Sequence, residues 1–271
     1  MNAASWLEVA RGDAPLIVSL PHTGLDLGVI EPRLVSPWLA RKDTDWWIER
    51  LYDFAGDLGA TIVRTAVSRT VIDVNRDPSG ASLYPGRATT GLCPTTTFDG
   101  EALYRDGEAP SSDEIAARRM AWFDPYHAAL KAEIDRLAGR GGRVVLYDCH
   151  SIRSEIPRLF EGELPVFNLG TNGGLSADPA LRRAVAAVVE ASGQSFVVDG
   201  RFKGGWITRA CGDRERGVHA LQMELACRGY MREPRRVDSA NWPSPYASSF
   251  AEGMRRTLRD VLQAALDWAR A

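Results

Sequence analysis

Acids and histidines that directly follow apolar runs are the residues of this chain that could do chemistry. Residues Gly141–Ser151 read Gly-Gly-Arg-Val-Val-Leu-Tyr-Asp-Cys-His-Ser, a short apolar run that ends in an acid and a histidine. The run Val144–Tyr147 predicts a buried strand, and α/β sheets bind ligands beyond the carboxyl ends of their strands. Because Asp148 and His150 alternate along the chain, they share one face if the strand continues. Both are candidate site residues, and Cys149 between them is expected to point into the core.

A second histidine follows another predicted strand. The apolar run Leu16–Leu20 stops at the turn Pro21-His22-Thr23-Gly24. A single histidine is often a core or capping residue, so His22 suggests a site only if other polar groups converge on it. Asp43 and Asp45 lie in the next periodic segment, Pro37–Leu58, which has helical spacing. Acids near a helix start are often only partners of the helix dipole.

Arginine and asparagine stand at the end of a further predicted strand. After the strand Ala60–Arg64, the segment Thr70–Val74 also predicts a strand, and it ends in Asn-Arg-Asp-Pro. The forked guanidinium of Arg76 suits a carboxylate, and Asn75 beside it can donate to the same group. Arg69 precedes Arg76 by seven residues. This pattern favours the binding of an anionic ligand, although arginines also pair with surface acids.

One acid lies inside an apolar run. The segment Val218–Leu225 predicts a strand that places Gln222 and Glu224 on one face. A carboxylate inside such a strand is costly unless it has a partner or a function. Glu224 is therefore the acid that is hardest to explain as a solvated surface charge.

Taken together, these groups predict a hydrolytic metal site. Two imidazoles, His22 and His150, with a carboxylate from Asp43 or Asp45 are the ligand set of a catalytic zinc ion. Such an ion would polarise a carbonyl and lower the pKa of bound water to about 7. Glu224 would take the proton of the water and pass it to the leaving nitrogen.

The arginines complete this hypothesis. Arg69 could hold the developing oxyanion, and Arg76 with Asn75 could clamp a carboxylate of the substrate. No serine or cysteine nucleophile lies in a comparable setting. The predicted substrate is therefore a small molecule with a free carboxylate.

Three further features keep alternatives open. His127 lies in a predicted helix and is either structural or a support for the site. The turn Thr171–Gly174 could cradle an anion, but it lacks the lysine and the spacing of a P-loop. The pair Gly204-Gly205 either lets the backbone approach another group closely or forms a flexible loop.

Strands that alternate with helices along the whole chain predict an α/β fold. We expect a single domain over residues 1–271, with a mixed, mostly parallel sheet flanked by helices. The remaining expected elements are a helix over Ile115–Leu137 interrupted at Pro125, helices over Pro179–Ser192 and Phe250–Ala269, and strands over Val166–Gly170 and Phe196–Asp199. Residues Ser79–Pro110 are expected to form a long irregular segment, and such segments are usually functional or mobile.

Composition excludes several classes of protein. Among 271 residues the hydrophobic content is 45%, and the net charge of −2 leaves no basic footprint for nucleic acid. No apolar run approaches the roughly 18 residues of a membrane span, and no signal sequence is recognisable, so we expect a cytoplasmic protein without membrane partners. The four cysteines are widely spaced and form no C-x-x-C pair, which predicts free thiols.

The motifs together resemble the N-formylglutamate amidohydrolase family, also called N-formylglutamate deformylases. The resemblance is carried by Pro21–Gly24, Asp43–Asp45, Asp73–Arg76, Asp148–Ser151, Gly205–Thr208 and Gln222–Glu224. It implies metal-dependent hydrolysis of N-formyl-L-glutamate to formate and L-glutamate, the last step of one route of histidine degradation. It also implies a fold related to zinc carboxypeptidases and aspartoacylases.

The resemblance implies a role for each candidate residue. His22 and His150 match metal ligands for one Zn²⁺, or another divalent transition metal, per chain. Glu224 matches the general base, and Asn75 with Arg76 matches the carboxylate binder. Arg69, placed before this pair as in aspartoacylases, is expected to act as the oxyanion partner.

The chain departs from the superfamily pattern at one position. Where the pattern has a glutamate three residues after the first histidine, this chain has Leu25. We therefore assign the carboxylate ligand to Asp45, with Asp43 and Asp26 as alternatives. Asp148 is expected to orient an imidazole or to cap the following turn.

Two other functions compete with this assignment. A related metal amidase or carboxypeptidase could act on another N-acyl amino acid, because the carboxylate clamp is shared while the acyl pocket is not readable. An amino-acid-binding protein of the same fold without catalysis is the other alternative, although Glu224 and both histidines are present.

Overall fold

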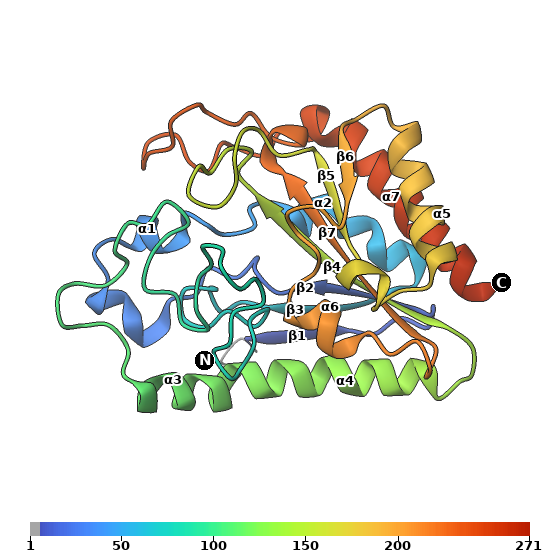
Figure 1. Cartoon of the computed structure of the whole chain (residues 1–271), viewed down its shortest axis with the longest axis horizontal. Coiled ribbons are helices and arrows are strands. Elements are labelled where there is room, and N and C mark those ends of the chain that lie inside the picture. The colour runs from blue at the N-terminus through green and yellow to red at the C-terminus, as the bar shows by residue number, and fades with distance from the viewer. Residues whose placement is uncertain (1–5) are drawn as a thin grey trace.

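A mixed seven-stranded sheet organises the chain. The computed structural model describes residues 6–271, and the first five residues of the predicted domain lie outside this range. The sheet has the order β1-β3-β2-β4-β7-β5-β6 (Figure 1). Its strands are β1 Leu7–Ala10, β2 Leu16–Leu20, β3 Thr61–Thr65, β4 Val144–Ile152, β5 Phe167–Gly170, β6 Phe196–Val198 and β7 Val218–Ala226. Four of the six strand pairs are parallel, and β1 with β3 and β5 with β7 are antiparallel, which confirms the predicted mixed sheet.

Helices cover both faces of this sheet (Figure 1). They are α1 Pro37–Arg41, α2 Ile48–Leu51, α3 Ser112–Arg118, α4 Asp124–Ala138, α5 Pro179–Ala191, α6 Trp206–Cys211 and α7 Ser248–Arg270. Helices α5 and α7 pack against each other on one side, and α4 runs along the other side, as the expected α/β class requires. Over residues 6–271 no helix has both the length and the apolar character needed to cross a bilayer.

The two faces of the central strands bury separate clusters of apolar residues. Along β4, Val145, Tyr147 and Cys149 pack with residues of α2, α5 and α7. Val144 and Leu146 alternate with them and pack with residues of α4 and α6. Every residue of β4 and β7 is buried, as is typical of strands covered on both faces. Cys149 thus points into the core as predicted, and all four cysteines are free.

The predicted helix over Pro37–Leu58 was wrong. The segment breaks into α1, α2 and a 3₁₀ helix at Asp53–Leu58. Trp47 adopts φ 64°, which no α-helix contains, and residues 42–47 form an irregular connection. Tertiary contacts override the helical spacing here, because the connection turns Asp45 toward the sheet, where the Asp45 amide donates to the carbonyl of His22.

The predicted strand over Thr70–Val74 was also wrong. These residues form turns and irregular backbone, although Val71, Ile72 and Val74 are buried in the cluster beside α4. A short apolar run cannot by itself distinguish a ladder strand from a buried loop. Here the amide of Asp73 donates to the carbonyl of Leu92, so the segment packs against another loop.

Smaller details concern element positions. The strand β7 lies between β4 and β5, inside the sheet. Pro125 does not interrupt its helix, because it occupies the first turn of α4, where its missing amide is harmless. A π-helical turn at Arg119–Phe123 joins α3 to α4. Residues 79–110 contain no helix and no strand of the sheet, which confirms the predicted long irregular segment.

Candidate metal centre and active site

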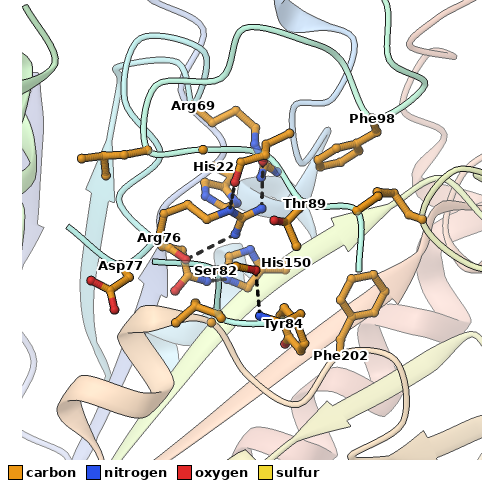
Figure 2. Close-up of a pocket in the computed structure, with 18 of the residues that line it drawn as sticks. His22, Arg69, Arg76, Asp77, Ser82, Tyr84, Thr89, Phe98, His150 and Phe202 are labelled. Carbon is orange, nitrogen blue, oxygen red and sulfur yellow. Dashed lines mark hydrogen bonds between the residues drawn. The ribbon is translucent and has the colours of Figure 1, made fainter. Parts of the chain in front are cut away.

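The predicted site residues meet at the carboxyl ends of β2, β4 and β7 (Figure 2). His22 lies in the turn after β2, and His150 and Glu224 are paired in register on β4 and β7. They line a cavity of about 160 Å³, to whose wall residues of the irregular segment 79–110 also contribute. Pockets for drug-sized ligands measure about 300–1,000 Å³, so this cavity suits a smaller molecule.

Three buried side chains could hold a metal ion. His22, Asp45 and His150 each offer a ligand atom, and these atoms lie within 4.8 Å of one another. Oδ2 of Asp45 lies 3.5 Å from Nδ1 of His22 and 3.0 Å from Nδ1 of His150. Two imidazole nitrogens and a carboxylate oxygen are the donors that Zn²⁺ and similar cations prefer.

Each histidine contacts a further carboxylate through the ring nitrogen that faces away from Asp45. Nε2 of His22 lies 2.7 Å from Oδ1 of Asp73, and Nε2 of His150 lies 2.9 Å from Oδ2 of Asp148. A carboxylate in this position fixes the ring and its tautomer, and leaves the opposite nitrogen to bind the metal. The contact of Asp148 agrees with its predicted role. Asp73 was not predicted to support His22, because its segment was interpreted as a strand.

The residues present fit a cation. Nδ1 of His22 is buried without a hydrogen-bond partner, although it faces Asp45, and a buried orphan of this kind points to a missing ligand. Burial opposes ionisation of His150, yet Asp148 and Asp45 raise its pKa well above the usual value. Burial would raise the pKa of Asp45, but His22 and His150 lower it to about 2. The centre therefore stabilises positive charge.

The alternative carboxylates point elsewhere. Asp43 accepts from the amide of Phe98 at 2.6 Å and lies 3.4 Å from a guanidinium nitrogen of Arg153. Asp26 is exposed and accepts from the amide of Gly28. Of the three candidates, the structure therefore places only Asp45 beside the two histidines.

Glu224 is a buried residue that lines the cavity. Nε2 of Gln222 donates to Oε2 of Glu224 at 3.1 Å, so one carboxylate oxygen is anchored. Burial raises the pKa of the Glu224 carboxyl to about 7, and neighbouring cations only partly offset this effect. A carboxylate with a pKa near the working pH is suited to general base catalysis.

Arg69 is buried between acids. Its Nη2 donates to Oδ2 of Asp73 at 2.7 Å, and its Nη1 lies 3.5 Å from Oδ1 of Asp45. Its guanidinium also stacks 4.8 Å from the ring centroid of Phe98. Arg69 lines the cavity beside both histidines, where a developing oxyanion could reach it.

Asn75 positions other parts of the site. Its Nδ2 donates to Oδ2 of Asp148 at 3.1 Å and lies 2.9 Å from Nε2 of His150. Its Oδ1 accepts from the amide of Ile207 in α6. A Cβ on Gly205 would lie 2.4 Å from the Asn75 amide group, so of the two alternatives for this glycine the structure shows the close backbone approach.

Arg76 borders the cavity on the opposite side from Tyr84 and Phe202 (Figure 2). Its Nη2 donates to Oγ1 of Thr90 at 3.0 Å and lies 3.7 Å from Oδ2 of Asp73. Its side chain keeps 22% of its surface exposed, so a carboxylate entering the cavity can reach it.

Two other sequence features are explained by structure. The Thr171–Gly174 turn is filled by Asp199, whose Oδ1 accepts from the amides of Thr171 and Gly173, so this turn already holds an anion. His127 places Nε2 2.8 Å from the carbonyl of Val74 and packs on Phe123, which is a structural role.

These features define an α/β protein with a candidate metal centre of the hydrolytic type. A profile of the N-formylglutamate amidohydrolase family matches residues 14–231, and the chain belongs to this family. It is 46% identical to the N-formylglutamate deformylase of Pseudomonas putida over 264 residues, covering 97% of this chain and 96% of that protein. It is also 46% identical to the N-formylglutamate deformylase of Pseudomonas aeruginosa PAO1 over 266 residues, covering 97% of each chain.

A solved structure supports the fold. The crystal structure of N-formylglutamate amidohydrolase from Ralstonia eutropha JMP134 superposes with a TM-score of 0.78, covering 98% of this chain and 99% of that chain at 23% identity.

Proposed function

We propose that this chain hydrolyses N-formyl-L-glutamate to formate and L-glutamate. The observation that carries the proposal is the buried centre of His22, Asp45 and His150, which opens into a cavity lined by Glu224 and by cationic side chains. The 46% identity to two proteins named N-formylglutamate deformylase supports the choice of substrate. As the family resemblance implies, the reaction would be the last step of histidine degradation.

We further propose that His22, Asp45 and His150 hold one Zn²⁺, or another divalent transition metal, per chain. When bound, such an ion supplies Lewis acidity that polarises a carbonyl and makes water a stronger acid. Asp73 and Asp148 keep the two imidazoles oriented from behind. All of residues 1–271 are assigned to one catalytic domain.

The other side chains perform the proton transfer and hold the substrate. Glu224, with its raised pKa, accepts the proton of the attacking water and donates it to the leaving nitrogen. Arg69 stabilises the charge that develops on the carbonyl oxygen. Arg76, with Asn75 beside it, binds a carboxylate and so orients the substrate for attack.

Formate release from N-formyl-L-glutamate by the purified, metal-loaded protein tests this proposal. The matched measurement is acetate release from N-acetyl-L-glutamate, which differs only in the acyl group. We expect formate release to exceed acetate release by orders of magnitude. Turnover of the acetyl compound with N-formyl-L-glutamate untouched would favour the related N-acyl amidase, and turnover of neither compound would contradict hydrolysis of this substrate class.

A further inference from the structure

One of the three arginines that line the cavity forms no direct ion pair with a described acid. Arg69 and Arg76 both lie within 4.0 Å of Asp73. Arg201, in the loop between β6 and α6, forms no ion pair within 4.0 Å in the part of the chain that the structure describes. An unpaired cation in the wall of a cavity is costly unless a ligand supplies the opposite charge.

Arg201 is nevertheless held firmly in place. Its Nε donates to the carbonyl of Leu159 at 2.8 Å, and one Nη donates to the carbonyl of Ala88 at 3.3 Å. Its guanidinium carbon lies 5.2 Å from the ring centroid of Tyr84 and 5.1 Å from that of Phe202. Stacking and two carbonyl contacts restrain the fork, while the other Nη has no hydrogen bond to a described residue. A pre-organised donor of this kind binds a carboxylate at low entropic cost.

The two cationic ends of the cavity are separated. Figure 2 shows Tyr84 and Phe202, on which Arg201 stacks, on one side, and Arg76 with Asp77 on the other. At the other end, the Arg201 guanidinium lies by Tyr84 and Phe202 with one Nη free of hydrogen bonds to described residues. A ligand with two carboxylates therefore matches the cavity better than a ligand with one.

We propose that Arg201 binds the side-chain carboxylate of the substrate and makes the site selective for N-formyl amino acids with an acidic side chain. This inference rests on the proposed function, in which Arg76 binds the carboxylate next to the scissile amide. Selectivity at Arg201 would depend on charge. The amide analogue N-formyl-L-glutamine tests this, because it has nearly the same shape as N-formyl-L-glutamate and lacks only the side-chain charge.

The experiment compares kcat/KM for N-formyl-L-glutamate and N-formyl-L-glutamine in wild type, Arg201→Gln and Arg201→Lys. Wild type should prefer the glutamate compound by about 10²-fold, since one partner of a desolvated charge pair is lost in the amide. Arg201→Gln should lower kcat/KM for the glutamate compound by a similar factor and change it less than about threefold for the amide. Arg201→Lys keeps the charge but loses the fork, so it should retain part of the preference.

Arg209→Gln is the matched control. Arg209 also stacks on Tyr84, at 5.2 Å, but it does not line the cavity, so its loss should leave the substrate preference unchanged. Equal losses for both substrates in Arg201→Gln would show a structural role and overturn the inference. Equal use of both compounds by wild type would also overturn it while leaving the proposed function intact, whereas absence of turnover of either compound by wild type would instead contradict the proposed function.

Discussion

The chemistry of the site depends on buried carboxylates with distinct partners. Asp45 faces the two imidazoles, whereas Asp73 and Asp148 lie behind them. Asp73 also accepts from Arg69, and although burial opposes ionisation, Arg76, His22 and Arg69 keep its pKa well below the usual value. Because removing one member of a buried charge network leaves the others uncompensated, each position has a measurable effect of its own.

Substitution Glu224→Gln tests the general base. The substitution keeps the shape of the side chain and leaves the neighbouring Gln222 in place, but it removes the proton acceptor. We expect kcat to fall by about 10² or more, with metal content and KM changed little. Steady-state kinetics and metal analysis of the same preparation measure both quantities. Loss of the metal from the variant would instead identify Glu224 as a ligand.

Substitution Asp73→Asn tests the support of His22. The amide cannot accept as a carboxylate does and no longer compensates Arg69, so we expect metal affinity to fall by about 10- to 100-fold. Competition with a chromophoric chelator measures the affinity. Asp43→Asn is the matched control, because Asp43 is also a largely buried acid of this region but contacts the amide of Phe98 and Arg153. An equal loss of affinity in both variants would contradict a specific role for Asp73.

Some residues of the site could be predicted from the sequence and others could not, for physical reasons. His22 and His150 each follow an apolar run, and that position signals the edge of a sheet. The choice among Asp45, Asp43 and Asp26 depends on backbone that departs from its local pattern, so spacing could not make it. Arg201 lies in a loop without periodicity. Only its position in the cavity wall, without a direct ion pair, distinguishes it from a surface arginine.

At the scale of elements, the site depends on register and on close approach between segments. In-register pairing of the buried strands β4 and β7 sets His150 against Glu224, and alternation along each strand predicted the shared faces correctly. The segments that deliver Asp45 and Asp73 are irregular instead. The apolar residues of these segments are buried in the core although the backbone forms no continuous helix or strand there. Their spacing therefore resembles that of a helix in one segment and of a strand in the other, and neither predicted element forms.

Substitution Gly205→Ala tests the approach of α6 to the site. The added Cβ would lie 2.4 Å from the Asn75 amide group, which is anchored by Asp148 and by the amide of Ile207. We expect a loss of about 1–3 kcal/mol in the free energy of unfolding from overpacking, and a fall in kcat/KM of roughly 10²-fold from displaced groups. Denaturant unfolding and kinetics measure the two effects.

Gly56→Ala is the control for this change. Gly56 is exposed, has no positive φ, and has nothing within 4 Å of an added Cβ. It should therefore keep wild-type activity and stability. Wild-type activity in Gly205→Ala would show that Asn75 does not position the site.

At the scale of the whole molecule, the topology gathers distant segments at one end of the sheet. The neighbouring strands β2, β4 and β7 are parallel, so their carboxyl ends coincide, and loops from residues 22–45 and 69–76 meet there. The alternation of strands and helices predicted this mixed sheet. The position of β7 inside the sheet could not be predicted, because it depends on the antiparallel pairing of β5 with β7, and sequence order does not determine it.

This topology couples metal binding to global stability. His22, Asp45 and His150 come from three segments that are far apart in the chain, so the site exists only when the sheet is formed. A metal that binds the folded state at 1,000 times its Kd stabilises that state by about 4 kcal/mol, which corresponds to a rise in Tm of roughly 10 °C for a domain of this size. Thermal unfolding after chelator treatment and after restoring Zn²⁺ measures the shift. Asp45→Asn should lose most of this shift when each protein is compared with its own metal-free form, and a wild-type Tm that responds to neither chelator nor Zn²⁺ would contradict a resident metal at this centre.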